Sequence, residues 1–361
     1  MADLELARNP ERFRALKPDW DDLWQRSENA GAFQSFDSCL KIWETIAAPA
    51  GRKLCCVLGW DEGRLIAVWP LVIYRRHLWI YLRPLEINDA ECSSALIDDA
   101  VDQTQWIAAA WEILRRQSGA DIAILPHFKQ ASALAGILQR HHFEEEAGVA
   151  VHVPLRAESA WESYYASLSK SHRRDHAKSA RRLSELGQID VKVVEPGDRR
   201  GPLLIDWLLA QKRAWAERVN KKGAWLYAQG FRDFLVAYHA DEEASPACQL
   251  MELTLNGEPL AVQLYFCGKV ILHAVIAGFD MRYQKQSPGV LLNQHLLRWA
   301  MQRRLDCYLG LGAEQNKKFW SRNEVVEIKS YRISVSWWGR AATWLRSMKQ
   351  RNGGEKLPSE S

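Results

Sequence analysis

The residues best suited to chemistry lie close together between positions 270 and 320. An apolar run at 270–279 predicts a buried strand that ends at Asp280. The tripeptide Ser-Pro-Gly at 287–289 then predicts a helix start, because Ser favours the cap and Pro the first helical position. The first amides of a helix have no partner inside it, so such an end favours a phosphate-like anion. The sequence therefore predicts an anion site beside a strand end.

Four side chains in this stretch could transfer a proton. His273 lies inside the apolar strand and has an ordinary pKa, about 6.5, that suits a base near neutral pH, although a core histidine shows the same pattern. Asp280 follows the strand, where ligand sites of α/β domains open, and could equally cap a helix. Glu314 is either an acid of the site or an exposed loop acid. Tyr283 could donate a proton or simply pack.

Two further pairs of residues could hold the anion. Ser287 and Gly289 would do so through the helix amides, and Lys317 and Lys318 would add positive charge. The lysines precede the aromatic pair Phe319-Trp320, and basic and aromatic side chains together suit a phosphate and an adenine ring. Structural capping and a solvated turn are the alternatives.

A basic segment at 170–182 is another candidate surface. The sequence favours a solvated helix face and leaves binding of an anionic substrate, lipid headgroup or nucleotide as the alternative. The small net charge of +4 argues against nucleic acid as the main ligand. The segment sets one acid, Asp175, against Lys170, Arg173, Arg174, Lys178, Arg181 and Arg182.

The composition allows two globular domains. The chain has 361 residues, of which 47% are hydrophobic and 25% charged. It contains no run of eighteen or more uncharged apolar residues, and its first eighteen residues are charged throughout, so we expect no spanning helix, no secretory signal and a cytoplasmic protein. The seven cysteines lack metal-ligand spacing. We expect them to be reduced core residues, and we expect no metal.

Helical and strand patterns alternate along the chain, which predicts an α/β fold. The pattern Gly-x-x-aliphatic-Ala-Val occurs at 63–68 and at 257–262, each time directly after a predicted hairpin turn. The two copies lie 194 residues apart, and chance is the alternative to a repeat. We interpret them as two like domains, 1–153 and 154–335, followed by an amphipathic helix and a disordered tail at 336–361.

The helix expected at 337–351 carries its apolar residues on one stripe, with Arg340 and Arg351 beside it. Trp and basic residues on an amphipathic helix fit peripheral attachment to an anionic membrane surface. Docking of the stripe on the helix's own domain is the alternative. The stripe consists of Trp337, Ala341, Trp344, Leu345 and Met348.

Several motifs together resemble the CelD/BcsL-type acyltransferases, a branch of the GNAT superfamily related to the Fem peptidoglycan aminoacyltransferases. The resemblance covers most of residues 30–330. The motifs are Phe33-Gln34-Ser35, Gly63 to Leu71, Leu168 to Arg174, Lys212 to Trp215, Phe279 to Tyr283, Ser287-Pro288-Gly289, and Gly312-Ala313-Glu314 with Lys317. The usual GNAT phosphate loop, Gln/Arg-x-x-Gly-x-Gly/Ala, is reduced here to Ser-Pro-Gly, and Asn316 stands where the family tends to have Tyr.

The resemblance implies two tandem GNAT-like domains, each a mixed, mostly antiparallel sheet flanked by helices. It implies transfer of an acyl group from acetyl-CoA or a longer acyl-CoA to an amine of an envelope, exopolysaccharide (cellulose included) or lipid precursor, long-chain sphingoid amines among them. The implied catalytic residues are Asp280, His273, Glu314 and Tyr283, the CoA-binding residues are Ser287, Gly289, Lys317 and Lys318, and the substrate-binding residues are Arg173, Arg174 and Trp215.

Two other functions stay open at this point. In a Fem-type aminoacyl-tRNA-dependent transferase the basic segment would hold RNA, although the long heptad stretch of a Fem coiled-coil arm is not visible. In a non-catalytic scaffold of polysaccharide synthesis the fold would persist without the chemistry, which the reduced phosphate loop permits.

Overall fold

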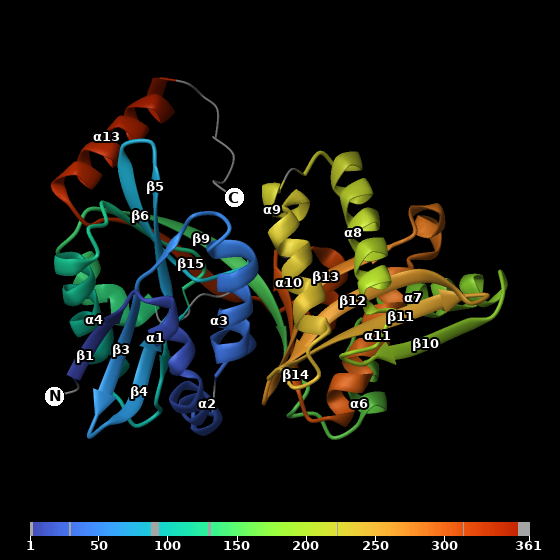
Figure 1. Ribbon diagram of the computed structural model, residues 1–361. Helices are drawn as coiled ribbons and strands as arrows, with labels where there is room; N and C mark the ends of the chain where they lie inside the picture. Colours follow the sequence, from blue (N-terminus) through green and yellow to red (C-terminus); the bar gives the residue numbers. More distant parts are fainter. Residues whose placement is uncertain are drawn as a thin grey trace. The chain divides into compact units, whose positions relative to one another are not determined.

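The computed structural model describes residues 3–28, 30–87, 94–128, 131–221, 223–312 and 314–352. They form two units: unit 1 contains Met1–Gly148 and Ile328–Ser361, and unit 2 contains Val149–Glu327 (Figure 1). Both are mixed α/β, with sheets flanked by helices. Cys92 and the predicted disordered tail lie outside the described residues.

Unit 1 contains two groups of strands. One has the order β1-β3-β4-β7, and the other runs from β15 through β8, β6 and β5 to β2. Its strands are β1 (Asp3–Ala7), β2 (Lys53–Leu54), β3 (Cys56–Asp61), β4 (Arg64–Trp69), β5 (Leu71–Arg76), β6 (Trp79–Pro84), β7 (Leu96–Ile97), β8 (Ile122–Leu125), the first part of β9 (Phe143–Val153), and β15 (Val326–Ser334). Its helices are α1 (Pro10–Ala15), α2 (Lys17–Arg26), η1 (Ala32–Gln34), α3 (Phe36–Ile42), η2 (Trp43–Ala47), α4 (Gln103–Gln117), η3 (Ala131–Leu134), α5 (Ala135–Leu138) and α13 (Trp337–Asn352).

Unit 2 is built on one mostly antiparallel sheet with the order β10-β11-β12-β13-β14-β9, in which only β13 and β14 run parallel. Its strands are β10 (Ile189–Val194), β11 (Ala247–Leu255), β12 (Glu258–Cys267), β13 (Ile271–Phe279), β14 (Asp306–Leu311) and the end of β9. Its helices are α6 (Trp161–Ser167), α7 (Lys170–Ser184), α8 (Gly201–Arg218), α9 (Ala224–Tyr227), α10 (Gln229–His239), η4 (Met281–Gln286), α11 (Pro288–Gln302), α12 (Gln315–Lys318) and η5 (Phe319–Ser321).

Strand β15 does not lie where the sequence placed it. The expected second domain ran to residue 335, whereas Ile328 and the residues after it belong to unit 1. The reason is pairing, because Tyr331–Ser334 form an antiparallel ladder with Ile122–Leu125 of β8. Ile333 is fully buried in the core of unit 1. Unit 1 is therefore closed by a strand from the far end of the chain.

The two motif copies occupy equivalent hairpins. Glu62 and Gly63 have φ of 47° and 77°, and Asn256 and Gly257 have φ of 52° and 85°. Left-handed conformations at both central positions match the twist of a tight hairpin, which explains the glycines. Each copy opens the second strand of its hairpin, β4 in unit 1 and β12 in unit 2.

The helical segment that contains the basic residues 170–182 is preceded by a separate short helix. Helix α6 ends at Ser167, and α7 begins at Lys170. Between them Leu168 is extended, with ψ of 158°, and its side chain is buried in the unit 2 core. Burying Leu168 outweighs the continuous helical pattern at this point.

A β-bulge in β13 exchanges the two faces to which the strand's alternate side chains point. Tyr265 of β12 pairs with Ala274 and Leu264 pairs with Ile276, so Val275 is left between the two pairs. Before the bulge, Leu272 and Ala274 join the core beneath α6, α7 and α11. After it, Phe279 faces this core and Gly278 faces α8, where a Cβ on Gly278 would lie 3.0 Å from the Leu208 carbonyl oxygen. The bulge therefore lets α8 approach the carboxyl end of β13.

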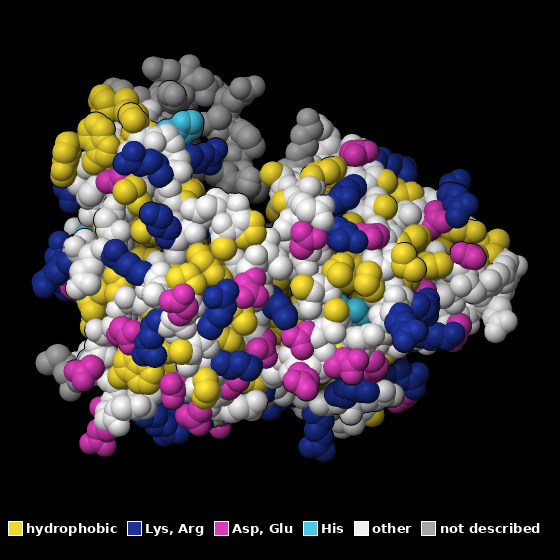
Figure 2. All heavy atoms as spheres, viewed as in Figure 1, with side chains coloured by type: hydrophobic (Ala, Val, Ile, Leu, Met, Phe, Trp, Pro, Cys, Tyr) yellow, Lys and Arg dark blue, Asp and Glu magenta, His cyan; other side chains and the backbone are white. Residues whose placement is uncertain are grey.

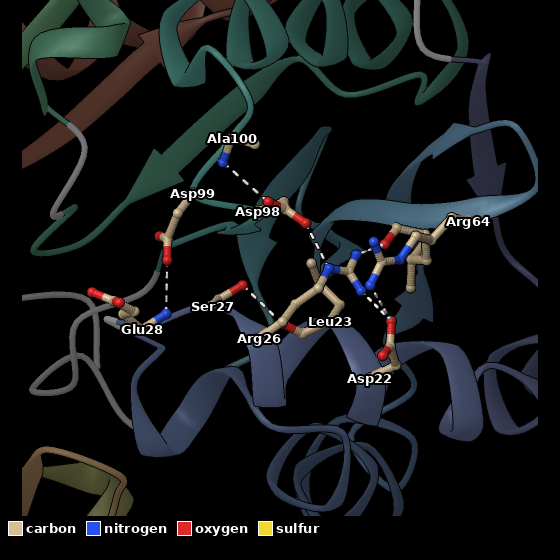
Figure 3. A network of polar contacts seen from close by, with 10 residues as sticks. Asp22, Leu23, Arg26, Ser27, Glu28, Arg64, Asp98, Asp99 and Ala100 are labelled. Atoms are coloured by element: carbon tan, nitrogen blue, oxygen red, sulfur yellow. Dashed lines mark hydrogen bonds and ion pairs between the residues drawn. The ribbon is translucent and has the colours of Figure 1, made fainter.

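A polar network ties α2 to the segment after β7 in unit 1 (Figure 3). The Arg26 Nε donates to Asp98 at 2.6 Å, and the same guanidinium contacts Asp22 and the Leu65 carbonyl. The backbone N–H of Glu28 donates to Asp99 at 2.8 Å. Because the Arg26 and Asp98 side chains are only 17% and 18% exposed, this pair is shielded from solvent better than an ordinary surface ion pair.

The state of the cysteines and the character of the helices were both predicted from the composition. The six described cysteines are free thiols, and burial raises the pKa of Cys55 and Cys56 to about 12, as expected for reduced core residues. None of the helices formed by the described residues has both the length and the apolar character needed to cross a membrane.

Candidate active site

The carboxyl ends of β13 and β14 form the centre of unit 2. The two parallel strands pair only at Ile271–His273 with Asp306–Tyr308. Further along β14, Leu311 pairs with Ala150 of β9. Gly310 and Gly312, on either side of Leu311, adopt left-handed φ values of 82° and 88°. The last parts of β13 and β14 therefore diverge. Ligand sites of α/β folds lie at such carboxyl ends, so we expect the candidate site among the segments that follow the two strands.

Asp280 follows β13 directly and begins η4. Its carboxylate accepts the Arg282 backbone N–H at 2.9 Å and forms an ion pair with the Arg282 guanidinium at 2.6 Å. These contacts with Arg282 hold the pKa of Asp280 below its usual value. A carboxylate in this state accepts a proton weakly, so the geometry favours the capping role that the sequence left as the alternative.

The predicted helix start is present as α11. Pro288 is its first residue, and Ser287 precedes it with left-handed φ and ψ of 51° and 52°. The Ser287 side chain makes no capping hydrogen bond, so the amides of the first turn are not occupied by that hydroxyl. Gly289 lies in this turn, and Tyr283 of η4 is partly buried against the neighbouring core. The segment after β13 therefore contains the N-terminus of α11, a helix of 15 residues, and Tyr283 lies close to it in the chain.

The segment after β14 gathers charged side chains. The Lys317 ammonium donates to the Leu311 carbonyl at 2.7 Å and lies 3.2 Å from the Glu314 carboxylate. Lys221, from the end of α8, approaches the same carboxylate at 3.7 Å. Partial burial opposes ionisation of Glu314, but Lys317 and Lys221 outweigh it and lower the pKa of Glu314. Glu314 is thus a charged, 45% exposed group between two lysines.

Lys212 joins this cluster, although no role was predicted for it. Burial, followed by the charges of Lys317 and Lys221, lowers the pKa of Lys212 to about 8, against the opposing effect of Glu314. Its ammonium lies 4.2 Å from the centre of the Trp215 ring, and Lys221 lies 5.6 Å from the same ring. The structure therefore brings Trp215, Glu314 and Lys317 together around the half-buried amine of Lys212. We call Lys212, Trp215, Lys221, Glu314 and Lys317 the lysine cluster.

A signal for Lys212 does exist in the sequence of α8. The buried residues of this helix recur at Ile205, Leu208, Leu209 and Ala216. At 3.6 residues per turn, position 212 falls in the middle of that apolar stripe. A lysine there must either be buried or displace the helix, and a buried lysine has a perturbed pKa.

The remaining predicted residues lie in different surroundings. His273 is 4% exposed inside β13, and its ring lies 5.5 Å from that of Tyr308 in β14. Lys318 is half-buried in α12, next to Lys317. In α7, Arg173 donates to the Leu168 carbonyl at 3.1 Å, and Arg174 is exposed. Because α7 packs against both α11 and η4, its basic residues lie beside the elements that follow β13.

Phe319 and Trp320 do not form the exposed adenine platform that the sequence suggested. They are 2% and 0% exposed and belong to the unit 2 core. His172 and His176 of α7 pack on them, with ring centres 4.8 Å and 4.6 Å from Phe319. Burial beside His172 lowers the pKa of His176 to about 4, so this histidine is neutral. The two aromatic rings fix α7 to the segment after β14.

Comparisons with known proteins agree with this geometry. Residues 170–318, which include β13, α11, β14 and the lysine cluster, match the family model described as acetyltransferase (GNAT) domain. No curated protein matches the sequence at a significant level.

Several solved structures share the architecture of both units. FemX is 10% identical, over 91% of this chain and 98% of its own, with a TM-score of 0.61. L-PGS from Bacillus licheniformis is 12% identical, over 91% and 92%, with a TM-score of 0.51. A tandem GNAT protein from the clavulanic acid biosynthesis pathway is 10% identical, over 92% and 99%, with a TM-score of 0.50. At such identities the likeness concerns the fold alone. The chain therefore has a fold like that of the tandem GNAT protein, and its residues 170–318 are similar to the acetyltransferase (GNAT) domain.

Proposed function

We propose that the protein is an acyl-CoA-dependent N-acyltransferase, which transfers an acetyl or longer acyl group to an amine of an envelope, exopolysaccharide or lipid precursor. The observation that carries the proposal is Lys212, a half-buried amine whose pKa is lowered to about 8 by burial and by Lys317, against the opposing effect of Glu314. It lies inside the segment that matches the acetyltransferase domain. An N-acyltransferase needs a proton acceptor of this kind, because an amine enters the reaction as an ammonium ion.

The CoA moiety binds at the N-terminus of α11. Its pyrophosphate accepts a hydrogen bond from the Gly289 amide, because the Ser287 and Val290 amides already donate to the Gln284 and Ser287 carbonyls and Pro288 has no N–H. The helix dipole favours negative charge at this end. Arg173 and Arg174 of the neighbouring α7 add positive charge to this region. The missing glycines of the usual phosphate loop are offset in this way.

The acyl transfer proceeds at the lysine cluster. The Glu314 carboxylate attracts the ammonium of the acceptor, and neutral Lys212 takes its proton. The free amine nitrogen attacks the thioester carbonyl carbon, a C–N bond forms, the C–S bond breaks, and CoA leaves as a thiolate. The Tyr283 hydroxyl gives a proton to the thiolate and regains, through water, the second proton that the amine nitrogen loses as the amide forms, while the Lys212 ammonium releases its proton to solvent. Asp280 positions η4 and Tyr283 through its contacts with Arg282.

Product analysis tests this proposal. Purified protein is incubated with acetyl-CoA or a long-chain acyl-CoA and with either an amino sugar or a sphingoid amine, and the products are identified by mass spectrometry. We expect one N-acylated amine, together with thermal stabilisation of the protein by the matching acyl-CoA. A folded protein that neither forms an amide with any of these amines nor is stabilised by any acyl-CoA would favour the scaffold instead.

A second candidate function is a Fem-type transfer from aminoacyl-tRNA. The observation that favours it is α7, in which Leu183 is the single buried residue of the helix and six basic side chains follow the remaining surface. Such a helix could contact RNA phosphates. Retention of charged tRNA at moderate salt, lost on reversing the charge of Arg174 and Lys178, would support this donor over acyl-CoA.

A further inference from the structure

Helix α13 packs on unit 1 through its small residues. A Cβ on Gly339 would lie 1.9 Å from the Asp121 carbonyl oxygen, so only glycine permits this approach. Thr343 Oγ1 lies 3.0 Å from Ser334 Oγ, and Ala342 packs into a small cluster with Tyr81 and Ile122. The docked face is therefore Gly339, Ala342 and Thr343, and the close fit fixes the helix's rotation.

The aromatic stripe predicted from the sequence is consequently on the outer face. In the stripe, Trp337 is 76% exposed, Trp344 57% and Leu345 45%, and the neighbouring Trp338 is 40% exposed. The alternative, in which this stripe docks on its own domain, does not hold for these three stripe residues. A contiguous exposed patch of large apolar residues marks a binding surface in a folded protein.

The tip of the β5–β6 hairpin extends this patch. Leu78 is 66% exposed at the tip, and the Trp79 ring N–H donates to the Trp338 carbonyl at 3.3 Å, which joins the hairpin to α13. Arg75 and Arg76 are exposed beside Leu78, and Arg340 is exposed on α13. In Figure 2, hydrophobic and basic side chains gather at this end of unit 1. We call α13 and the hairpin tip the Trp–Arg face.

The charges of this face decide what can cover it. Neither residues 71–84 nor residues 336–352 contain an Asp or Glu, whereas Arg75, Arg76 and Arg340 are exposed on the face. A second copy of the same face would bring these like charges together. A surface that offers both phosphate groups and an apolar layer satisfies the two components at once.

We propose that the Trp–Arg face binds the surface of a lipid bilayer that contains anionic phospholipids. The indole rings enter the headgroup layer, where an aromatic ring and its N–H are both accommodated. The arginines bind lipid phosphates, and their attraction depends on the negative surface charge. The helix lies parallel to the bilayer without crossing it, in keeping with its polar, small-residue inner face. The proposal does not depend on the proposed acyl transfer, because vesicle binding is measured without turnover.

Vesicle sedimentation of the full chain tests the proposal. Phosphatidylcholine vesicles with and without phosphatidylglycerol are the probes. We expect binding to the phosphatidylglycerol vesicles that is at least about tenfold stronger than to phosphatidylcholine alone and that declines as salt rises. Binding of equal strength to both kinds of vesicle, or to neither, would overturn the proposal.

Paired variants locate the binding to the face. Trp337→Ser with Trp344→Ser, and separately Arg75→Glu with Arg76→Glu, should each weaken binding at least about tenfold. Leu203→Ser, at a side chain that is 73% exposed on α8, and Arg116→Glu, at one that is 70% exposed on α4, are the controls and should bind like the wild type. Circular dichroism confirms that each variant is folded. If light scattering shows a dimer that the tryptophan variant dissociates, and vesicles are not bound, the face belongs to a second copy and the proposal fails.

Discussion

At the scale of single residues, Lys212 shows what a sequence can and cannot indicate. Its place in the apolar stripe of α8 was readable, since Leu208, Leu209 and Ala216 surround it. Its neighbours Glu314 and Lys317 were not, because they follow a strand about a hundred residues later and approach only in the folded chain. The periodicity of a helix identifies its buried face and says nothing about the charges across from it.

The pH dependence of acyl transfer tests the role of Lys212. The pKa of Lys212 is lowered to about 8, so its neutral, proton-accepting form is gained as pH rises through that value. We expect kcat/KM to increase with pH up to an inflection near 8 that stays in place when acceptor amines of different pKa are compared.

Two substitutions of Lys212 complete this test. Lys212→Met removes the base and Lys212→Arg keeps it permanently charged, so both should lower the rate about 100-fold or more. Lys192→Met, on an exposed part of β10, is the matched control. An inflection that persists in Lys212→Met would show that another group accepts the proton.

Asp98 supports a prediction about stability. Burial alone would raise its pKa, but the hydrogen bond and charge of Arg26 outweigh burial, and the pKa of Asp98 is lower in the folded chain. The carboxylate therefore stabilises the fold above the ordinary Asp pKa of about 3.9, and this contribution is lost as pH falls through the folded value. Asp98→Asn should reduce the free energy of unfolding at pH 7 by about 1–2 kcal/mol.

Urea unfolding measures this effect. The difference between the wild type and Asp98→Asn should shrink as pH falls below about 4. Asp3→Asn, at an exposed carboxylate, should unfold at the same urea concentration as the wild type, both at pH 7 and below about pH 4. A difference that is independent of pH would mean that Asp98 acts by shape and not by charge.

At the scale of elements, the helix start at α11 was predicted correctly, whereas its cap was not. Ser-Pro-Gly does open the helix, but Ser287 adopts a left-handed conformation and its side chain makes no capping bond. The sequence indicates which residues favour a cap, while the turn at Ser287, which ends η4 and begins α11, decides the backbone angle. The Gly289 amide remains the feature on which the anion site depends.

Gly289→Glu separates helix stability from ligand binding. A Cβ on Gly289 would lie 3.6 Å from Phe279 Cδ1, which is an ordinary contact, and an acidic side chain favours a helix N-terminus by about 0.3–1 kcal/mol. The same negative charge repels a pyrophosphate. Calorimetry should show acyl-CoA binding at least about tenfold weaker than in Gly289→Ala, with no loss of thermal stability. Equal binding by the two variants would place the CoA phosphates elsewhere.

Other elements were missed for a reason that concerns pairing. The acid-rich first half of β9 has no strand-like alternation, and it forms because β9 continues into a ladder with β14. Strand β1 lies in the charged N-terminal segment, for which no strand was predicted, and it is held by β3, some fifty residues later. Local patterns found the hairpins, whose partners are neighbours in sequence, and missed the strands whose partners are distant.

At the scale of the whole molecule, the two-domain prediction was close, and the repeated hairpins mark the two units. The return of β15 to unit 1 was not visible, because it depends on the pairing with β8. This has a consequence for stability. A substitution near the C-terminus should weaken unit 1, which contains most of the N-terminal half of the chain, and spare unit 2.

Ile333→Ala tests this connection. Ile333 is fully buried in the unit 1 core, so the cavity left by the substitution should reduce the free energy of unfolding of unit 1 by about 2–4 kcal/mol. Hydrogen exchange should show faster exchange in β8 and unchanged protection in β12. Val326→Ala, at a 48% exposed position of the same strand, should leave both unchanged. Loss of protection in β12 alone would contradict the assignment of β15.

We propose that unit 2 transfers an acyl group from CoA to an amine at the lysine cluster. The most direct measurement is the rate at which free thiol appears when acyl-CoA is mixed with wild-type protein, with and without an acceptor amine, beside Lys212→Met. We predict release that requires the amine and falls about 100-fold or more in the variant. Thiol release that is independent of the amine, or that is equal in the wild type and in Lys212→Met, would contradict acyl transfer at the lysine cluster.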